Sequence, residues 1–146
     1  MQVRDILKAK GHQTRTIGPD QKIKEAMQLL LEHKISCLPV VAPAGDLLGI
    51  VSDKDIFRRA FEMPESFLEC VVSEIMTSDL IIGLESDEID YIAAIMTKNR
   101  IRHIPIVDSD RLVGLVSVGD VVKSRLEHIE IENRYLKQYI DGTYPG

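Results

Sequence analysis

The stretch "GIVSDKD", from Gly49 to Asp55, is matched sixty-five positions later by "GLVSVGD", from Gly114 to Asp120. The two stretches share a glycine, a valine, a serine and an aspartate in the same order and at the same spacing. Each begins with residues typical of a β-strand and ends with residues typical of the start of a helix. The motif therefore predicts, at two places in the chain, a strand that leads directly into a helix.

The repeat continues on both sides of this motif. "HKISCLPVV" at residues 33–41 corresponds to "NRIRHIPIV" at residues 99–107, and "VRDIL" at residues 3–7 resembles "VSEIM" at residues 72–76. A repeat of this length is usually one supersecondary unit that packs against its neighbour. The sequence thus predicts two copies of one unit.

Each copy shows the same change of periodicity. Before each proline-containing run, apolar residues recur every three or four positions, as they do on one face of a helix. The β-branched runs at residues 38–41 and 104–107 are followed by turn residues and by "LLGIVS" and "LVGLVS", which predicts a hairpin in each copy. A second helix is predicted to begin at Asp53 or Val118. One unit is therefore a short strand, a helix, two strands and a helix.

The fold class that follows is α+β, with two β-α-β-β-α units related by a pseudo-twofold axis and a C-terminal helix. A unit of about 60 residues buries its sheet poorly on its own. We therefore expect the two units to pack sheet to sheet and to share one core. The predicted divisions are residues 3–70 for the first repeat, 71–126 for the second and 127–146 for a helical tail.

Composition excludes several classes of protein. The 146 residues are 45% hydrophobic and 28% charged, an ordinary globular balance, and the net charge is -5. Lys and Arg residues are scattered, so no basic stripe predicts binding to nucleic acid. No apolar run approaches the roughly 18 residues of a membrane-spanning helix, and the first residues lack the apolar centre of a secretory signal. We expect a cytoplasmic protein that binds neither nucleic acid nor membrane.

The cysteines and histidines predict no further chemistry. Cys37 and Cys70 form no C-x-x-C pattern, so reduced thiols are expected. The four histidines lack the spacing of metal ligands, and no metal site is expected. No serine, cysteine or carboxylate has an evident base partner, which argues against an enzyme.

The serine and the aspartate of the repeated motif allow two interpretations. Ser52 and Ser117 fall at predicted helix starts, where serine is a favoured N-cap, and Asp55 and Asp120 follow at the spacing of a capping box. The same groups also suit a nucleotide. The free N–H groups of a helix start attract phosphate, a hydroxyl donates to phosphate, and a carboxylate accepts both hydroxyls of a ribose.

The charged neighbours of the motif differ between the copies. Lys54 and Arg58 lie beside the first motif, where they would meet phosphate charge. The second motif has Gly119 at the matching position, and its nearest following cation is Lys123. We therefore expect two clefts that are not equivalent.

The doubled motif, the doubled segments before each hairpin and the two leading segments together resemble a tandem pair of cystathionine-β-synthase (CBS) domains, often called a Bateman module. The resemblance covers nearly all of residues 3–125. It implies a regulatory module without catalytic activity or catalytic cofactor, which binds AMP, ADP, ATP or NAD(H) in clefts between the copies. It also implies a homodimer and a regulated partner protein of unknown identity.

The resemblance assigns the ribose to Asp55 and Asp120, and the neighbourhood of phosphate to Ser52 and Ser117. Adenine would lie against the backbone before each strand proline and against the opening strands. For Arg102 and His103, a contact with phosphate and an ordinary surface or hydrogen-bonding role are equally open. The remaining residues expected to line the nucleotide are Thr16, Ile35, Ser36, Cys37, Pro39, Lys54, Arg58, Ile82, Ile101, Pro105, Gly119 and Lys123. Among these, Cys37 is favoured as a small buried strand residue.

A ligand-free dimerisation or scaffold protein is the rival interpretation, in which the repeated motif only caps helices. The C-terminal tail is relevant to both interpretations, because it could form a contact between two copies. The residues of its seam step by four and three, the pattern of a two-stranded coiled coil: Val122, Leu126, Ile129, Asn133, Leu136 and Ile140. Asn133 at a core-type position is common in dimers. The pattern is shorter than three heptads, so folding back onto the chain's own domain is equally open.

Overall fold

The computed structural model describes residues 1–11 and 14–140 of the chain. Gly142 and Pro145, which the sequence predicts to end the last helix, lie outside this part. The elements in chain order are α1 (Val3–Lys10), α2 (Ile23–His33), β1 (Cys37–Val41), β2 (Leu47–Ser52), α3 (Asp53–Glu62), η1 (Phe67–Glu69), η2 (Val72–Glu74), α4 (Ile89–Asn99), β3 (His103–Asp108), β4 (Arg111–Ser117) and α5 (Val118–Ile140). The predicted α+β class with a C-terminal helix is confirmed.

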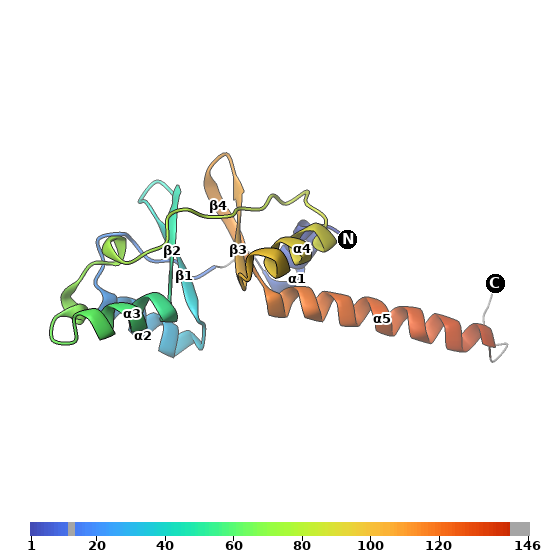
Figure 1. The fold of residues 1–146 in the computed structure, drawn as a ribbon. Helices are drawn as coiled ribbons and strands as arrows, with labels where there is room; N and C mark the ends of the chain where they lie inside the picture. The colour runs from blue at the N-terminus through green and yellow to red at the C-terminus, as the bar shows by residue number, and fades with distance from the viewer. Residues whose placement is uncertain (12–13, 141–146) are drawn as a thin grey trace.

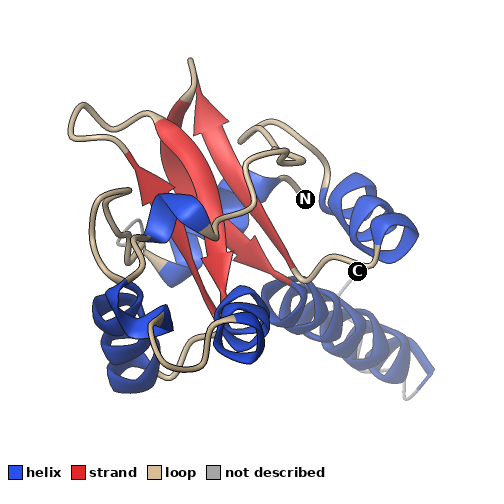
Figure 2. Cartoon of the chain, turned by 60° about the vertical axis from the view of Figure 1, so that its left-hand side comes forward, coloured by secondary structure: helices blue, strands red, loops and turns tan. Residues whose placement is uncertain are grey.

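Two antiparallel hairpins, β1–β2 and β3–β4, form the centre of the molecule. Their registers are equivalent, since Cys37 pairs with Ser52 in the first and His103 pairs with Ser117 in the second. Figure 1 shows the hairpins side by side, with α2 and α3 beneath the first hairpin, α1 and α4 beside the second, and α5 starting beneath the second. Figure 2 shows the strands as one central group flanked by helices. The predicted sheet-to-sheet arrangement is confirmed.

The opening strand of each unit is shorter than the sequence suggests. It consists of one parallel bridge in each repeat, Ile17 to Val40 and Gly83 to Ile106. Each bridge places its opening segment along the hairpin of its own repeat. The opening segments therefore line the hairpins without forming full strands.

The two leading segments are exchanged between the repeats. Val3 and Leu7 of α1 are buried among α4, β3 and β4, and so belong to the core of the second repeat. Val72, at the start of η2, is buried in the core of the first repeat. Thr77 then donates its N–H to the carbonyl of Ile50 in β2 at 2.8 Å. Each repeat thus completes its core with a segment that precedes the other repeat in the chain.

The expectation of one shared core is wrong. The buried apolar residues of the described chain form two clusters, one within each repeat. The exchanged segments, the neighbouring hairpins and the bridge from Asp46 to Arg111 hold the halves together. Each half instead closes its own core with the exchanged segment that packs on it.

The exchange explains the repeated glycine. A Cβ atom on Gly49 would lie 2.7 Å from the carbonyl oxygen of Thr77, and one on Gly114 would lie 2.6 Å from a methyl carbon of Leu7. Real Cβ atoms are not found at such distances. Glycine is required at position 49, where the exchanged segment brings a backbone carbonyl against the strand, and it is favoured at position 114, where the Leu7 side chain lies against the strand.

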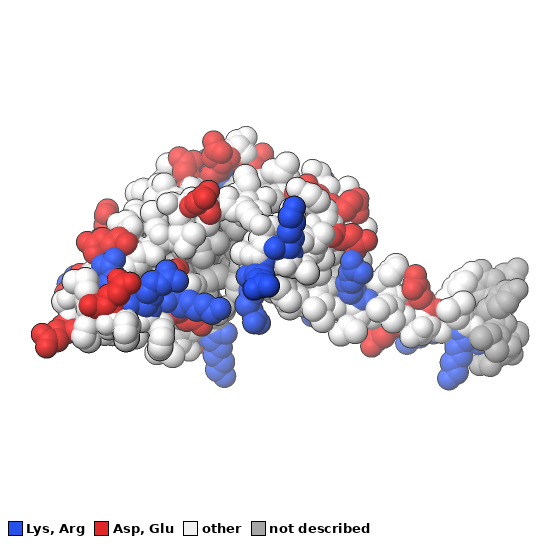
Figure 3. Space-filling model, in the orientation of Figure 1, with Lys and Arg blue, Asp and Glu red and all other residues white. Residues whose placement is uncertain are grey.

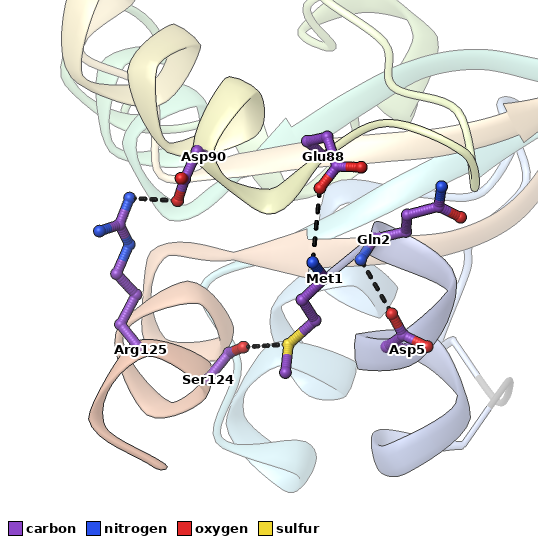
Figure 4. A network of polar contacts seen from close by, with 7 residues as sticks. All are labelled: Met1, Gln2, Asp5, Glu88, Asp90, Ser124 and Arg125. Atoms are coloured by element: carbon purple, nitrogen blue, oxygen red, sulfur yellow. Dashed lines mark hydrogen bonds and ion pairs between the residues drawn. The ribbon is translucent and has the colours of Figure 1, made fainter. Parts of the chain in front are cut away.

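Polar contacts join α1, α4 and α5 at the far end of the second repeat (Figure 4). The amino group of Met1 lies 3.4 Å from the Glu88 carboxylate, and Ser124 of α5 donates its hydroxyl to the sulfur of Met1. Arg125 of α5 pairs with Asp90 of α4. These contacts connect the first turns of α5 to the body of the protein, where Val121 and Ser124 are buried.

Beyond those turns α5 runs away from the body, as Figures 1 and 2 show. The apolar side chains of the predicted seam stay about half exposed, including Leu126 at 56% and Leu136 at 57%. The described part of the tail therefore does not fold back onto its own domain. Within residues 1–11 and 14–140, no helix is long and apolar enough to cross a bilayer.

Candidate nucleotide-binding clefts

The first cleft lies between the repeats and has a volume of about 320 Å³. The end of β2 and the start of α3 form one wall, and the chain around the start of β3 forms the other. Half of the predicted residues meet here: Ser36, Cys37, Ser52, Lys54, Asp55, Ile101, Arg102, His103 and Pro105. The other lining residues are Ile50, Asp53, Thr77, Asp79, Leu80, Ile81 and Arg100.

Asp55 caps α3 and lines this cleft at the same time. Its Oδ2 accepts the backbone N–H of Ser52 at 2.9 Å and the hydroxyl of Ser52 at 3.0 Å. The Ser52 hydroxyl oxygen in turn accepts the N–H of Asp55, which completes the predicted capping box. Both bonds to the carboxylate end on Oδ2, and among the described residues no hydrogen bond ends on Oδ1. The cap therefore leaves one carboxylate oxygen available to a ligand hydroxyl.

The N–H groups at the start of α3 are already bonded. Asp53 donates its N–H to the carbonyl of Ser36 at 2.9 Å, and Lys54 donates to the carboxylate of Asp53. The N–H of Asp55 bonds to Ser52, as described above. The expectation that free N–H groups at this helix start hold phosphate is therefore wrong. Phosphate in this cleft would have to meet the side chains of Lys54, Arg100 or Arg102.

The second cleft is larger, at about 580 Å³, and has a different charge. Five predicted residues line it: Ile35, Ser36, Cys37, His103 and Ser117. Three cations that the sequence analysis did not identify, Lys10, Arg15 and Lys34, line it as well. Figure 3 shows basic side chains along the hollowed underside of the molecule and acidic side chains near the hairpin tips.

Lys10 of α1 forms a salt bridge with Asp120, the aspartate of the second repeated motif. Its ammonium group lies 2.7 Å from Asp120 Oδ2 and donates to the carbonyl of Leu115 at 2.9 Å. Asp120 also accepts the N–H of Ser117 at 2.8 Å, and the Ser117 hydroxyl accepts the N–H of Asp120, as in the first repeat. Partial burial raises the pKa of Asp120, but the bonds from Lys10 and Ser117 outweigh it and the net pKa is lowered. The two repeated aspartates therefore differ, since among the described residues only Asp120 has an ammonium partner.

The repeat itself predicts this difference once the leading segments are aligned. With "VRDIL" over "VSEIM", Lys10 corresponds to Asp79. Each of the two lines a cleft, Asp79 the first and Lys10 the second. One pair of equivalent positions therefore adds a negative charge to the first cleft and a positive charge to the second.

Cys37 and His103 are equivalent in the repeat, and both line both clefts. Burial raises the pKa of the Cys37 thiol to about 12, with a smaller contribution from Asp53 and Asp55, so the thiol stays protonated. Burial and then the charge of Arg102 lower the pKa of His103, so the imidazole is neutral at pH 7. Neither residue brings a charge to the middle of the molecule at neutral pH.

Several predicted residues lie outside the lining of both clefts. Asp120 and Lys123 line a smaller hollow of about 200 Å³ next to α1, together with Lys10. The others that line neither cleft are Thr16, Pro39, Arg58, Ile82 and Gly119. Their contacts with a nucleotide stay predictions. In the described residues, no group of three or more His, Cys, Asp or Glu side chains is placed to hold a metal ion.

Two repeats, each closed by the other's leading segment, with a capped aspartate facing a cleft between them, define the architecture of a CBS domain pair. The sequence model of the CBS domain family matches residues 3–62 and 72–127. The chain belongs to this family.

Relatives of comparable length support this assignment. The CBS domain-containing protein YhcV of Bacillus subtilis is 33% identical over 80% of this chain and 81% of its own length. The mitochondrial CBS domain-containing protein CBSX3 of Arabidopsis thaliana is 30% identical over 97% of this chain and 73% of its own.

Solved structures share the fold. The CBS-domain containing protein ATU1752 from Agrobacterium tumefaciens superposes with a TM-score of 0.80 at 36% identity, over 86% of this chain and 99% of the other. The CBS domain pair of protein MJ0100, in complex with methylthioadenosine and S-adenosylmethionine, has a TM-score of 0.73 at 32% identity, over 89% and 98%. CBSX2 in complex with AMP has a TM-score of 0.71 at 25% identity, over 86% and 96%.

Proposed function

We propose that the protein is a non-catalytic regulatory module that binds an adenosine-containing ligand in the first cleft. The observation that carries this proposal is the bonding of Asp55, whose Oδ2 caps α3 while Oδ1 keeps its capacity to accept a hydroxyl. A carboxylate at the wall of a cleft between two repeats is suited to the paired hydroxyls of a ribose. The cations at the same cleft are suited to phosphate.

The ligands named for the similar structures support adenosine as the shared part. MJ0100 is described with methylthioadenosine and S-adenosylmethionine, and CBSX2 with AMP. These molecules have adenosine in common and differ in what the 5′ carbon carries. We propose AMP, ADP, ATP or NAD(H) as candidates for this chain because they share that adenosine.

Signalling would follow from a change in the orientation of the two repeats relative to each other. A ligand in a cleft between them shifts their arrangement only if it binds one arrangement more tightly. We propose that a regulated partner protein reads this arrangement and that the module is a homodimer. Phe57 and Phe61 on α3 correspond in the repeat to Val122 and Leu126 on α5. All four side chains are half or more exposed, which gives each repeat an apolar surface for a second copy.

Calorimetry and thermal melts with AMP, ATP, NADH, S-adenosylmethionine and methylthioadenosine test the proposal. A ligand at about a hundred times its Kd adds about 2.7 kcal/mol of stability, which raises Tm by roughly 5–10 °C. Asp55→Ala should abolish this rise. Asp87→Ala is the matched control, because Asp87 also accepts a backbone N–H three residues back, at 2.8 Å, outside both clefts.

The same panel tests the rival scaffold function. The capping boxes are complete without a ligand, which is the observation that favours it. Melts that do not move with any ligand of the panel would support a scaffold. A shift that survives Asp55→Ala would show that ligand binds elsewhere.

A further inference from the structure

We propose that the outer part of α5 forms a parallel, in-register, two-stranded coiled coil with α5 of a second copy. This goes beyond the proposed homodimer by fixing the segment, the direction and the register of the contact, and it does not depend on ligand binding. The described segment that carries it runs from Leu126 to Leu136 and extends away from the body in Figure 1.

The apolar stripe of this segment has the spacing of a coiled-coil seam. With Leu126 at heptad position a, Ile129 falls at d, Asn133 at a and Leu136 at d. Leu126, Ile129 and Leu136 are 56%, 48% and 57% exposed, so their own chain does not cover them. A stripe that repeats every three and four residues is covered best by an equal stripe on another helix.

The seam lies on a different face from the one that docks on the body. Val121 and Ser124 are buried against the body at 6% and 9% exposure. With about 100° between successive residues of a helix, the centre of the seam is turned by about 130° from this docked face. In a two-fold pair, each body therefore lies on the far side of its own helix and leaves the seam accessible.

The charges that flank the seam select a parallel pair. In a parallel coiled coil, a residue at position g faces position e of the next heptad in the second helix. Arg125 at g then meets Glu130 of the second copy, and Glu132 at g meets Lys137 of the second copy. Both pairs are attractive and each occurs twice by symmetry.

An antiparallel pair that overlaps the whole seam is opposed by the same charges. Positions g then face g, and positions e face e. Glu132 would meet Glu132 of the second copy, Glu130 would meet Glu130, and Lys123 would meet Lys137. Repulsion between like charges at these positions destabilises the antiparallel arrangement.

Asn133 specifies the same register. An asparagine at position a pairs with its own counterpart only when two parallel helices are aligned, and otherwise its amide is buried against an apolar side chain. Alignment at Asn133 also brings Leu126 to Leu126 and Leu136 to Leu136. The seam and the charges thus agree on one arrangement.

Arg125 and Glu132 form ion pairs within their own chain, and these pairs do not prevent the coiled coil from forming. Arg125 pairs with Asp90 and Glu132 lies 3.3 Å from His128, and all four side chains are more than half exposed. Exposed pairs of this kind contribute little, so exchange for pairs with a second helix is not costly.

Disulfide formation in the full chain tests the direction and the register. Leu136→Cys, in a Cys70→Ser background, should oxidise to a covalent dimer, because equal d positions face each other in a parallel pair. Ile131→Cys is the matched control, since Ile131 is 69% exposed and lies opposite the seam. It should remain monomeric on a denaturing gel. Equal yields from the two variants would overturn the proposal.

Charge reversal provides a second measurement, by light scattering over a dilution series. Glu132→Lys and Lys137→Glu should each weaken the dimer several-fold, and the double variant should restore the wild-type dilution midpoint because the pair is again attractive. Failure of the double variant to recover, or a wild-type chain that stays monomeric at micromolar concentration, would contradict a parallel coil. Neither outcome bears on ligand binding by Asp55.

Discussion

A single aspartate can both cap a helix and bind a sugar, because a carboxylate has two oxygens. In the first repeat, Asp55 uses Oδ2 for the cap. In the second repeat, Lys10 bonds to the oxygen of Asp120 that also serves the cap. The two interpretations of the repeated motif are therefore compatible. The two carboxylates differ in that Asp120 has an ammonium partner and does not line the second cleft, whereas Asp55 lines the first.

The repeated glycines give a prediction about stability. Gly49→Ala should destabilise the protein by about 1–3 kcal/mol, because the new methyl group meets a backbone carbonyl oxygen that a ladder bond holds in place. Gly114→Ala should cost less, since it meets the end of the Leu7 side chain, which can adjust. Urea unfolding measures both. Equal losses for the two variants would contradict the difference between a backbone and a side-chain obstacle.

His103 gives a prediction about pH. Its pKa in the folded protein is lowered below the ordinary 6.5 by burial and by Arg102, so the unfolded chain binds more protons between the two values. Stability should therefore fall as the pH drops from above 6.5 through the lowered pKa of the folded state.

His103→Gln should flatten this part of the curve of unfolding free energy against pH. The control is His128→Gln, which removes an exposed histidine on α5. A curve that is equally steep with and without His103 would show that another group is responsible.

Among the elements, α1 is the one whose position the sequence did not predict. The helices and hairpins of each repeat follow from local periodicity, which is why their predicted order agrees with the structure. The resemblance of "VRDIL" to "VSEIM" showed that the leading segments are equivalent, but no local pattern says which repeat a segment packs on. Lys10 was missed for the same reason, since it reaches the second cleft only through this exchange.

The exchange of α1 predicts where a core substitution acts. Leu7→Ala should cost about 2–5 kcal/mol, because Leu7 is 1% exposed within the core of the second repeat. Leu31→Ala on α2 should cost less than about 0.5 kcal/mol, since Leu31 is 77% exposed. Hydrogen exchange should show faster opening of α4 and β3 in Leu7→Ala before α2 opens. Faster exchange confined to the first repeat would contradict the observed exchange of segments.

At the scale of the whole molecule, the two clefts share Ser36, Cys37 and His103 in their walls. Their charges differ, because the first cleft has three aspartates beside its cations, whereas Lys10, Arg15 and Lys34 surround the second. The repeated motif predicted non-equivalent clefts from Lys54 and Gly119, and the larger part of the difference lies in residues outside the motif. Their contribution depends on how the repeats are placed in space.

This difference predicts how many ligands bind. Methylthioadenosine, which has no phosphate, should occupy the first cleft alone, because Asp55 lines that cleft whereas Asp120 does not line the second one. ATP should occupy both clefts, and the second site should weaken with added salt and in Lys34→Met. Calorimetric stoichiometry measures this. Two equal sites for methylthioadenosine, or a second ATP site insensitive to salt, would contradict it.

The exchanged segments also have a consequence for biosynthesis. The ribosome releases α1 long before the helix and strands that will bury Val3 and Leu7 have been made. The first repeat in turn lacks its covering segment until Val72 and Thr77 have emerged. A nascent chain halted before residue 72 should therefore expose apolar surface and bind chaperones, and native structure should appear only after the second repeat has left the exit tunnel.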